Sequence, residues 1–348
     1  MRILHINFER GYRGGERQTL LLLGGLRTKG IEVELLARTE SDLAMMARAE
    51  GHLVHTRENL ISALSWFIPT HKRYQVVHAH TANAVTLAIL ARPAHRSPVI
   101  FTRRTNFSSH LDLLRKIKWR YINKIVAVSE SAASYPIRLG FDTQIIYSSV
   151  PNVTADIGRT NQLIERHNLR GKKLIGTAGV FNADKDPFTL IRAAAILCKS
   201  NDDIVFLHWG VGGPLEQTAK QLASELGLSN RYLFLGFMKN PEQLFGALST
   251  FVLASRIEAL GTSLIDAMMA STPVIGTRIG GIRELLGNDR GLAIQPENPA
   301  AIADAISWVL THPTDAQTMA TRAFLYAQLA HSTHAMTKQY IELYDQLH

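Results

Sequence analysis

Segments typical of β-strands alternate with segments typical of α-helices along almost the whole chain. The strand-like segments are short runs rich in β-branched and apolar residues, and the segments between them carry apolar residues at helical spacing. Apolar strands that alternate with amphipathic helices are typical of a parallel sheet covered on both faces. The sequence therefore predicts an α/β chain with doubly wound sheets. The predicted strands are residues 3–8, 31–36, 76–80, 99–102, 125–128, 144–147, 174–178, 204–209, 232–235, 251–254, 274–277 and 291–294.

The alternation pauses once, in a polar stretch that begins near residue 148. We therefore predict two Rossmann-like domains, residues 1–150 and 173–330, joined by a linker over residues 151–172. Residues 331–348 are predicted to form a C-terminal helix that packs back on the first domain. Ligands of such sheets bind beyond the carboxyl ends of the strands, so we expect an active site in a cleft between two facing domains.

The positive charge of the chain is concentrated in its first half. Residues 1–150 carry 21 Lys and Arg against 11 Asp and Glu, a net charge of +10, whereas residues 151–348 carry 17 against 18, a net charge of −1. This asymmetry indicates an anionic partner for the first domain. Nucleic acid is not the expected partner, because the chain has no helix-turn-helix pattern, aromatic RNA-binding motif or zinc-ligand spacing.

Several protein classes are excluded by composition. Cys198 is the only cysteine, which excludes a disulfide framework and fits a reducing compartment. The N-terminal apolar run is too short for a signal peptide, and no run approaches the 18 or so apolar residues of a membrane-spanning helix. We expect a cytoplasmic protein.

Two predicted strand-to-helix loops carry residues suited to phosphate. Gly14 and Gly15 precede a helix whose first amides could bind an anion, although a plain turn is the alternative. Lys185 follows another strand and is either a point charge for phosphate or a solvated lysine between Asp184 and Asp186. These two aspartates have the spacing of a metal-binding pair, but Asp186 is expected to cap the next helix, so we predict no metal site.

A third loop places two carboxylates around a helix start. Glu258 follows the strand at residues 251–254, and Asp266 lies about one turn into the next helix. Amides suit phosphate oxygens and carboxylates suit sugar hydroxyls, so the loop predicts a site for a diphosphate flanked by sugars. Asp266 could instead interact favourably with the dipole of the helix, because a negative charge is stabilised near a helix N-terminus. The residues that begin the helix between the carboxylates are Gly261, Thr262, Ser263 and Leu264.

The ordered motifs resemble those of the retaining nucleotide-sugar glycosyltransferases of family four, which have the GT-B architecture of two facing Rossmann-like domains. The resemblance covers the whole chain and is strongest over residues 174–311. In the first half it rests on residues 14–16, 76–80, 126–130 and 146–151. In the second half it rests on residues 179–187, 190–193, 210–215, 234–237, 258–268 and 272–284.

The resemblance implies roles in a donor site. Glu258 corresponds to the carboxylate that contacts the transferred sugar, and Asp266, one methylene shorter than the glutamate usual there, to the group that takes the ribose hydroxyls. Lys185 corresponds to the diphosphate lysine, whereas its usual arginine partner is Val180 here. Arg256 or an arginine of the first domain is expected to supply the missing charge. Gly14 and Gly15 also belong to this donor site, and the base-contacting loop corresponds to Gly236, Phe237 and Met238.

The resemblance also implies that the first domain binds the acceptor. Where the family has a histidine after the fifth strand, this chain has Arg103 and Arg104. We expect Arg103 to act as the catalytic substitute, and Arg104 and Asn106 to contact the acceptor. His80 lies at another strand end, where it is either a site residue or a buried structural one. The charge of +10 suggests an anionic acceptor, such as a lipopolysaccharide core or a polyprenyl-diphosphate-linked glycan.

Residues 111–124 predict an amphipathic helix with a basic face. Leu114, Ile117 and Tyr121 recur at helical spacing and are expected to face the core. A tryptophan among cations suits the headgroup level of an anionic membrane, although an ordinary solvated face is the alternative. The expected membrane contacts are Arg115, Lys116, Lys118, Trp119 and Arg120.

The resemblance thus implies a retaining, metal-independent hexosyltransferase that needs no cofactor. The basic first domain and its amphipathic helix predict a place on the inner face of the cytoplasmic membrane. Lys185 and the loop amides would stabilise the departing diphosphate, and the acceptor hydroxyl would attack from the face that the diphosphate leaves. The alternatives are a nucleotide-sugar 2-epimerase of the same architecture and an inactive sugar-nucleotide-binding relative. The donor nucleotide (UDP, GDP or ADP), its sugar, the acceptor and its linkage, and the oligomeric state stay open.

Overall fold

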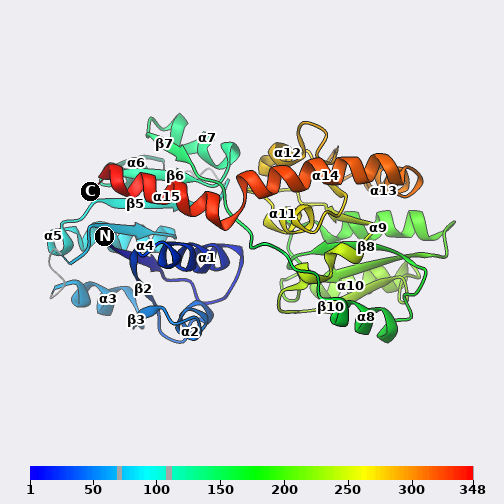
Figure 1. The fold of residues 1–348 in the computed structure, drawn as a ribbon, viewed down its shortest axis with the longest axis horizontal. Helices are drawn as coiled ribbons and strands as arrows, with labels where there is room; N and C mark the ends of the chain where they lie inside the picture. The colour runs from blue at the N-terminus through cyan, green and yellow to red at the C-terminus, as the bar shows by residue number, and fades with distance from the viewer. Residues whose placement is uncertain (69–72, 107–111, 348) are drawn as a thin grey trace. The chain divides into compact units, whose positions relative to one another are not determined.

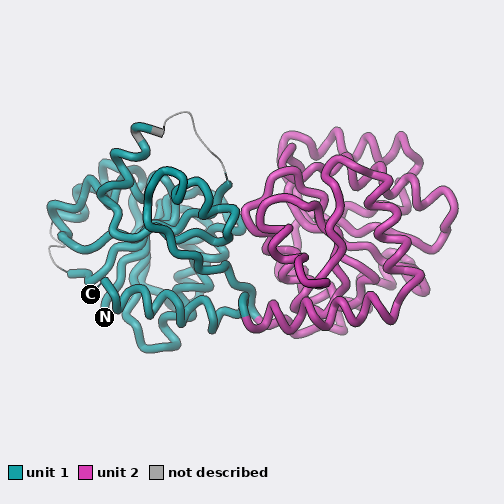
Figure 2. The backbone as a smooth tube through the Cα atoms, turned by 90° about the horizontal axis from the view of Figure 1, so that it is seen from above, with its two compact units in different colours: residues 1–151, 330–348 teal, residues 152–329 magenta. Residues whose placement is uncertain are grey.

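The computed structural model describes residues 1–68, 73–106 and 112–347. The chain divides into two compact units. Unit 1 comprises Met1–Pro151 and Ala330–His348, and unit 2 comprises Asn152–Leu329 (Figure 2). Each unit has a parallel sheet between helices (Figure 1). The predicted α/β class with two Rossmann-like sheets is confirmed.

The sheet of unit 1 has seven strands in the order β3-β2-β1-β4-β5-β6-β7. All described pairs are parallel, and the chain reverses its winding direction at β1 and β4. The edge strand β3 was not among the predicted strands, because its half-buried residues lack an apolar run. The strands are β1 (Arg2–Asn7), β2 (Glu32–Arg38), β3 (Leu53–Arg57), β4 (Val76–Ala79), β5 (Val99–Arg103), β6 (Lys124–Ala127) and β7 (Thr143–Ile145).

Four helices of unit 1 begin where a short polar side chain follows a strand. Ser41, Asn59, Thr81 and Ser129 each accept a hydrogen bond from an amide in the first turn of the helix that follows. The helices are α1 (Gly14–Thr28), α2 (Asp42–Ala49), α3 (Leu60–Phe67), α4 (Ala82–Leu90), α5 (Arg92–His95), α6 (Asp112–Trp119), α7 (Glu130–Arg138) and α15 (Thr333–Leu347).

The last helix, α15, packs against the first unit although the whole of unit 2 separates it from the rest of unit 1 in sequence. Met336, Tyr340 and Tyr344 are buried in the same apolar cluster as Leu23 and Leu26 of α1. Gly25 lets the two helices approach closely, because a Cβ there would lie 2.1 Å from the Thr337 hydroxyl. The core of unit 1 is therefore completed by the C-terminal segment.

The sheet of unit 2 has six strands in the order β10-β9-β8-β11-β12-β13, again all parallel. The strands are β8 (Lys173–Ala178), β9 (Ile204–Trp209), β10 (Tyr232–Gly236), β11 (Thr250–Leu253), β12 (Val274–Thr277) and β13 (Leu292–Ile294). The helices are α8 (Ile157–Arg166), α9 (Pro187–Cys198), α10 (Glu216–Glu225), the 3-10 helix η2 (Pro241–Ala247), α11 (Thr262–Met269), α12 (Gly280–Leu286), α13 (Pro299–Thr311) and α14 (Pro313–Ala330).

The stretch predicted as a linker, residues 151–172, contains a helix of unit 2. Asp156 caps α8 by accepting from the Arg159 amide at 2.9 Å. The Arg159 side chain then donates to the Gln243 side chain and to the Lys239 carbonyl, both at 2.9 Å. The sequence did not predict this helix, because the stretch is polar and the helix carries few apolar residues that would mark a buried face.

Candidate functional site

Two residues predicted to act together meet in unit 2. The Lys185 ammonium forms an ion pair with the Glu258 carboxylate, and both side chains are partly buried. They lie 73 positions apart in sequence, but they follow β8 and β11, which are neighbours in the sheet. The carboxyl ends of parallel neighbours lie at one edge, which explains how two distant loops join in one site.

The loop that carries Lys185 is fixed on two sides. The Asn182 side chain accepts from the Lys185 amide at 3.0 Å. The Asp184 carbonyl accepts from the Arg256 amide at 2.7 Å, so the two loops are joined through their backbones. Asp186 caps α9 by accepting from the Thr189 amide at 3.2 Å and its hydroxyl at 2.6 Å. The predicted capping role of Asp186 is confirmed.

Residues 261–264 form the start of α11, as predicted. Gly261 has a φ of +93°, a left-handed conformation that favours glycine, and its position lies against the Glu258 side chain. The Leu264 amide donates to the Gly261 carbonyl at 2.9 Å. The amides of Thr262 and Ser263 therefore lie at the N-terminus of the helix, where a bound anion is favoured. Asp266, one turn later, is buried.

The loop after β10 presents an aromatic ring to solvent. Gly236 ends β10 with a φ of +71°, and Phe237 is 77% exposed. Met238 beside it is half-buried. The Gly236 carbonyl accepts from the Gly210 amide at 2.8 Å, which ties this loop to the one after β9. An exposed ring held on an anchored loop offers a flat surface on which a nucleotide base can stack.

Arg256 was one of the residues expected to supply the charge that is missing at position 180. Val180 stands there, and Arg256 forms an exposed ion pair with Glu297 at 2.7 Å.

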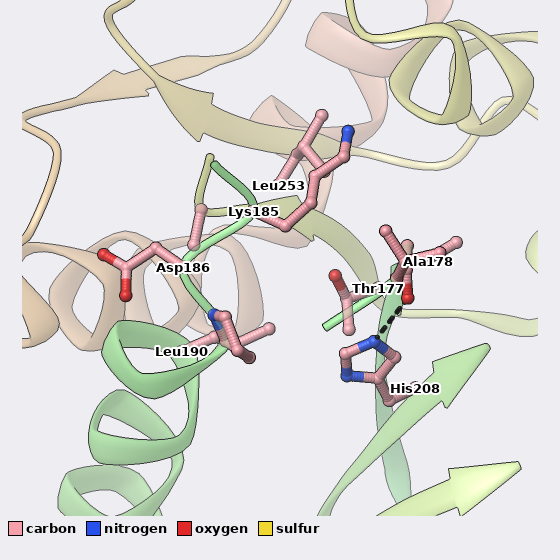
Figure 3. A pocket seen from close by; sticks show the side chains of 11 residues that line it. Thr177, Ala178, Lys185, Asp186, Leu190, His208 and Leu253 are labelled. Atoms are coloured by element: carbon pink, nitrogen blue, oxygen red, sulfur yellow. Dashed lines mark hydrogen bonds between the residues drawn. The ribbon is translucent and has the colours of Figure 1, made fainter. Parts of the chain in front are cut away.

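A pocket beside the Lys185 loop is lined by residues of β8, α9, β9 and β11 (Figure 3). In it His208 hydrogen-bonds to the Gly179 carbonyl (Figure 3). Sequence reasoning missed His208, because a histidine inside a strand carries no motif.

In unit 1, Gly14 and Gly15 begin α1, as predicted. Glu16 turns back to accept from the Arg13 amide at 3.1 Å, and Asn7 at the end of β1 donates to it at 3.2 Å. Arg104 passes close to Gly15, since a Cβ on that glycine would lie 3.9 Å from its side chain. The start of α1 therefore has both a backbone that an anion can approach and a guanidinium nearby.

Arg104 is held by a chain of buried histidines. Its guanidinium contacts the His80 Nδ1 at 3.0 Å, and the His80 Nε2 lies 2.9 Å from the His5 Nδ1. A guanidinium only donates, so His80 Nδ1 accepts and its Nε2 carries the hydrogen that bonds to His5. Burial, with the positive charge of Arg104, lowers the pKa of His5 to about 3 and that of His80 well below its usual value. Both rings are therefore neutral near pH 7.

A third histidine joins this network to α15. The His78 ring contacts the Tyr344 hydroxyl and the Thr102 hydroxyl, each at 2.7 Å. Ring nitrogens of His5, His78 and His80 lie within 4.8 Å of one another, close enough to share a metal ion. The adjoining Arg104 guanidinium opposes a second cation, however, and protein partners already bond to all three rings. These contacts make His80 a buried structural residue, the second of its two predicted roles.

Arg103 does not occupy the place predicted for it. Its side chain is buried, with the guanidinium 4.8 Å from the Tyr135 ring centre and 5.9 Å from that of Trp119. Its Nε donates to the Ala132 carbonyl at 3.3 Å. Burial, with the nearby Arg115 charge, lowers the pKa of Arg103 to about 10. Successive residues of a strand point to opposite faces, so Arg104 and not Arg103 joins the histidines at the strand ends.

The face of α6 is inverted relative to the prediction. Trp119 is only 4% exposed and packs against the rings of Phe101, Tyr135 and Phe141. Ile117, predicted to face the core, is 47% exposed, and Tyr121 just beyond the helix is 53% exposed. A tryptophan buries more apolar area than an isoleucine, which decides the side on which the helix packs. The side chain of Leu114, like residue 111, lies outside the described residues.

The exposed side of α6 is both apolar and basic. Leu113 is 71% exposed and lies one turn before Ile117. Arg120 is exposed, whereas Arg115, Lys116 and Lys118 are half-buried. Lys118 donates to the Thr86 hydroxyl at 3.3 Å. Asn106 is half-buried and precedes residues that the structure does not describe. Among the described residues no helix is long and apolar enough to span a bilayer.

Two family models match the chain in sequence. Residues 12–151 match the model described as Glycosyltransferase Family 4, and residues 160–325 match Glycosyl transferases group 1. A D-inositol 3-phosphate glycosyltransferase of Corynebacterium urealyticum is 29% identical over 93% of this chain and 78% of its own length. The lipopolysaccharide core biosynthesis mannosyltransferase LpcC of Rhizobium leguminosarum is 25% identical over 71% of each chain.

Solved structures share the fold. The crystal structure of Anabaena Alr3699/HepE in complex with UDP and glucose superposes with a TM-score of 0.89, at 19% identity and with complete coverage of both chains. The agreement extends over both units.

Proposed function

The chain belongs to glycosyltransferase family four, and on this premise we propose that it moves a hexose-type sugar from a nucleotide-diphosphate donor to a hydroxyl of an anionic, lipid-linked glycan. The observation that carries the proposal is the ion pair between Lys185 and Glu258 beside the start of α11. It joins a cation suited to a diphosphate, a carboxylate suited to sugar hydroxyls and helix amides suited to phosphate oxygens in one place.

The donor would lie along these groups. Lys185 and the amides of Thr262 and Ser263 would take the diphosphate, Glu258 the transferred sugar and Asp266 the ribose. The exposed ring of Phe237 would stack on the base. Bound UDP and glucose in the Anabaena structure support a nucleotide-sugar donor for a protein of this fold.

The family resemblance leads us to propose a retaining reaction, in which the same groups stabilise the leaving diphosphate. As the bond from the anomeric carbon to the diphosphate oxygen breaks, negative charge grows on the leaving oxygen, and Lys185 with the α11 amides stabilises it. The acceptor hydroxyl then bonds to the anomeric carbon on the face that the diphosphate leaves, and its proton passes to the departing phosphate. Configuration is retained without an enzymic nucleophile. These groups provide the charge stabilisation without a donor-site metal.

Two observations support an anionic acceptor that is found at a membrane. Unit 1 holds the basic excess, and α6 exposes Leu113 and Ile117 beside Lys116 and Arg120. Of the two relatives described above, one is named for D-inositol 3-phosphate, a small anion, and the other for lipopolysaccharide core biosynthesis. Both names fit an anionic acceptor, and only the second fits one that is found at a membrane. We infer that unit 1 binds the acceptor at the inner face of the cytoplasmic membrane, with Arg104 and Asn106 among its contacts.

A donor panel tests the proposal directly. We expect UDP-glucose, UDP-N-acetylglucosamine, GDP-mannose or ADP-heptose to raise the melting temperature, since a ligand bound only by the folded state stabilises it by mass action. At a concentration of 100 times the Kd the gain is about 2.7 kcal/mol. Absence of a shift with all four, and with the free nucleoside diphosphates, would falsify the donor site.

The alternative functions give different products with the donor that binds. A transferase consumes it only with an acceptor, apart from slow hydrolysis, and releases the nucleoside diphosphate. A 2-epimerase converts the donor without an acceptor and keeps the diphosphate bond. An inactive relative binds the donor and changes nothing. Chromatography of the nucleotide after incubation, with and without an extract of lipid-linked glycans, separates the three.

A further inference from the structure

His208 in β9 lies directly behind the loop that carries Lys185. Its ring is buried and stacks on Phe181 with centres 4.2 Å apart. The Nε2 lies 3.1 Å from the Gly179 carbonyl and the Nδ1 lies 3.0 Å from the Tyr232 hydroxyl. The first of these bonds is drawn in Figure 3. His208 is therefore held between Tyr232 of β10 and Gly179, the first residue of the loop.

The two partners fix one form of the ring. A backbone carbonyl only accepts, so Nε2 carries the hydrogen and donates it to Gly179. Nδ1 is then an acceptor, and the Tyr232 hydroxyl donates to it. Burial lowers the pKa of His208 to about 4, so the ring is neutral near pH 7 and its Nε2 remains a donor.

Holding the Gly179 carbonyl also orients the amide that follows it. The C=O and N–H of one planar trans peptide point in opposite directions. With the Gly179 oxygen turned toward His208, the Val180 N–H is turned the other way. The aliphatic part of the Lys185 side chain packs against the Cα of Gly179, because a Cβ on Gly179 would lie 3.6 Å from the lysine side chain. One peptide therefore sets the direction of an amide donor and supports the lysine.

Among the described residues, His208 is the only side chain that hydrogen-bonds to the Gly179–Val180 peptide. The Gly179 amide donates to the Trp209 carbonyl at 2.9 Å, and the Phe181 amide donates to the Gly212 carbonyl at 2.9 Å. Gly210 passes so close that a Cβ would lie 2.1 Å from the Gly179 oxygen. Backbone contacts thus fix both ends of the turn, and His208 holds the carbonyl between them.

We propose that His208 is a positioning residue of the donor site, which holds the Gly179 peptide so that the Val180 amide and Lys185 can bind the diphosphate of a nucleotide sugar. The proposal rests on the proposed function of this site. The Val180 amide would then make a contact to the diphosphate at the position where the family has an arginine side chain. His208 itself touches no substrate and acts only through the loop.

Two amide substitutions separate the roles of the two ring nitrogens. In His208→Gln the terminal amide reaches the place of Nε2 and can still donate to Gly179. In His208→Asn the shorter amide replaces only Nδ1 and leaves the Gly179 carbonyl without its donor. Both variants lose the ring stack on Phe181, and their side chains differ by one methylene group. We expect His208→Asn to weaken binding by about tenfold, because the Val180 amide would lose its hydrogen bond to the charged diphosphate, and His208→Gln by less than threefold.

Isothermal titration measures this with the nucleotide sugar of the four-member panel that stabilises the wild type most. Thr250→Val is the control, because it removes a buried hydrogen bond from Thr250 to the Pro273 carbonyl at the amino end of β11. It should lower the melting temperature without changing the Kd. Equal Kd values for His208→Asn, His208→Gln and the wild type would overturn the proposal, whereas a wild type that binds none of the panel would overturn the donor site itself.

A double-substitution cycle distinguishes positioning from general stability. If His208 acts through Lys185 and its loop, His208→Asn should raise the Kd by less in a Lys185→Ala protein than in the wild type. Additive effects in the cycle, together with equal losses in His208→Asn and His208→Gln, would show that His208 only supports the fold. Such a result would leave the donor site in place and reject the positioning role.

Discussion

At the scale of single residues, the pair formed by Lys185 and Glu258 bears on the proposed donor site. In the structure each neutralises the other, so a diphosphate bound as proposed would compete with Glu258 for Lys185. Glu258 would then be released toward the sugar. In this proposal, binding of the two halves of the donor is coupled through one ion pair.

Replacing the lysine tests its part in this exchange. Lys185→Ala should lower turnover by about 100-fold or more, which is the loss seen when a charge-stabilising donor is removed. Lys173→Ala is the matched control, because Lys173 begins the same strand and pairs with Asp203 at 3.2 Å. Steady-state rates with the identified donor measure both. Full activity of Lys185→Ala would reject its role.

The meeting of Lys185 and Glu258 was predictable from the sequence, whereas the surroundings of Arg103 and Arg104 were not. Lys185, Glu258 and the α11 start lie on strand-to-helix loops that carry ordered motifs. Arg103 and Arg104 carry no such information, because adjacent strand residues differ only in the face they point to. The neighbours on each face, Tyr135 on one and His80 on the other, come from distant segments.

At the scale of elements, α6 combines an exposed apolar strip with cations, although by a different face from the one predicted. The strip comprises Leu113, Ile117 and Tyr121. An amphipathic helix of this kind is suited to a membrane interface, where each basic residue near an anionic surface would add about 1 kcal/mol. The burial of Trp119 removes it from the proposed lipid contacts and leaves the exposed apolar strip with its cations.

Sedimentation with phosphatidylglycerol vesicles tests this helix. The wild type should sediment with the vesicles at low salt and less at high salt. Ile117→Glu should abolish most binding, because it places a carboxylate in the apolar strip. Ile61→Glu on α3 is the control, since Ile61 is 80% exposed in the same unit and lies outside the strip. Equal binding by both variants would exclude α6 as the contact.

The helix α15 offers a second test at this scale. Tyr344→Phe removes the hydroxyl that bonds to buried His78, and an unsatisfied buried polar atom costs about 1–3 kcal/mol. Tyr121→Phe, at an exposed ring, should change stability by less than about 0.5 kcal/mol. Urea unfolding compares the two. A Tyr344→Phe protein as stable as the wild type would mean that the hydroxyl contributes nothing to the docking of α15.

At the scale of the whole molecule, buried neutral histidines predict instability in weak acid. The pKa values of His5, His78, His80 and His208 are all lowered by burial. The unfolded chain takes up protons near pH 6.5, but the folded chain does not until the pH approaches about 3 for His5 and about 4 for His208. Stability is therefore greatest above pH 6.5 and falls as the pH drops below it.

Unfolding in urea at pH 7 and at pH 5.5 measures this loss. Each such histidine should cost about 1 kcal/mol over that interval, and three of the four lie in unit 1. If the units unfold separately, unit 1 should be the more acid-sensitive. Asp and Glu titrate mostly below this range, so they contribute little. Equal unfolding midpoints at the two pH values would contradict the neutral state of these rings.

Most of the architecture was predictable from the alternation of strands and helices, because buried parallel strands are continuous apolar runs. The exceptions are β3, an edge strand with half-buried residues, and α8, a helix with an exposed polar face. In both, few side chains reach a core, so burial leaves little pattern in the sequence. Their places are set by neighbours, such as Gln243 for α8.

The return of α15 to unit 1 sets an order of events during synthesis. Unit 1 is begun first, but 178 residues of unit 2 (152–329) must be translated before Tyr340 and Tyr344 leave the ribosome. At about 5–20 residues per second, the leucine face of α1 stays uncovered for on the order of ten seconds or longer. Unit 2, contiguous in sequence, can finish folding within that time. The half of the chain made first is thus completed last, and its nascent form exposes the apolar face of α1 in the meantime.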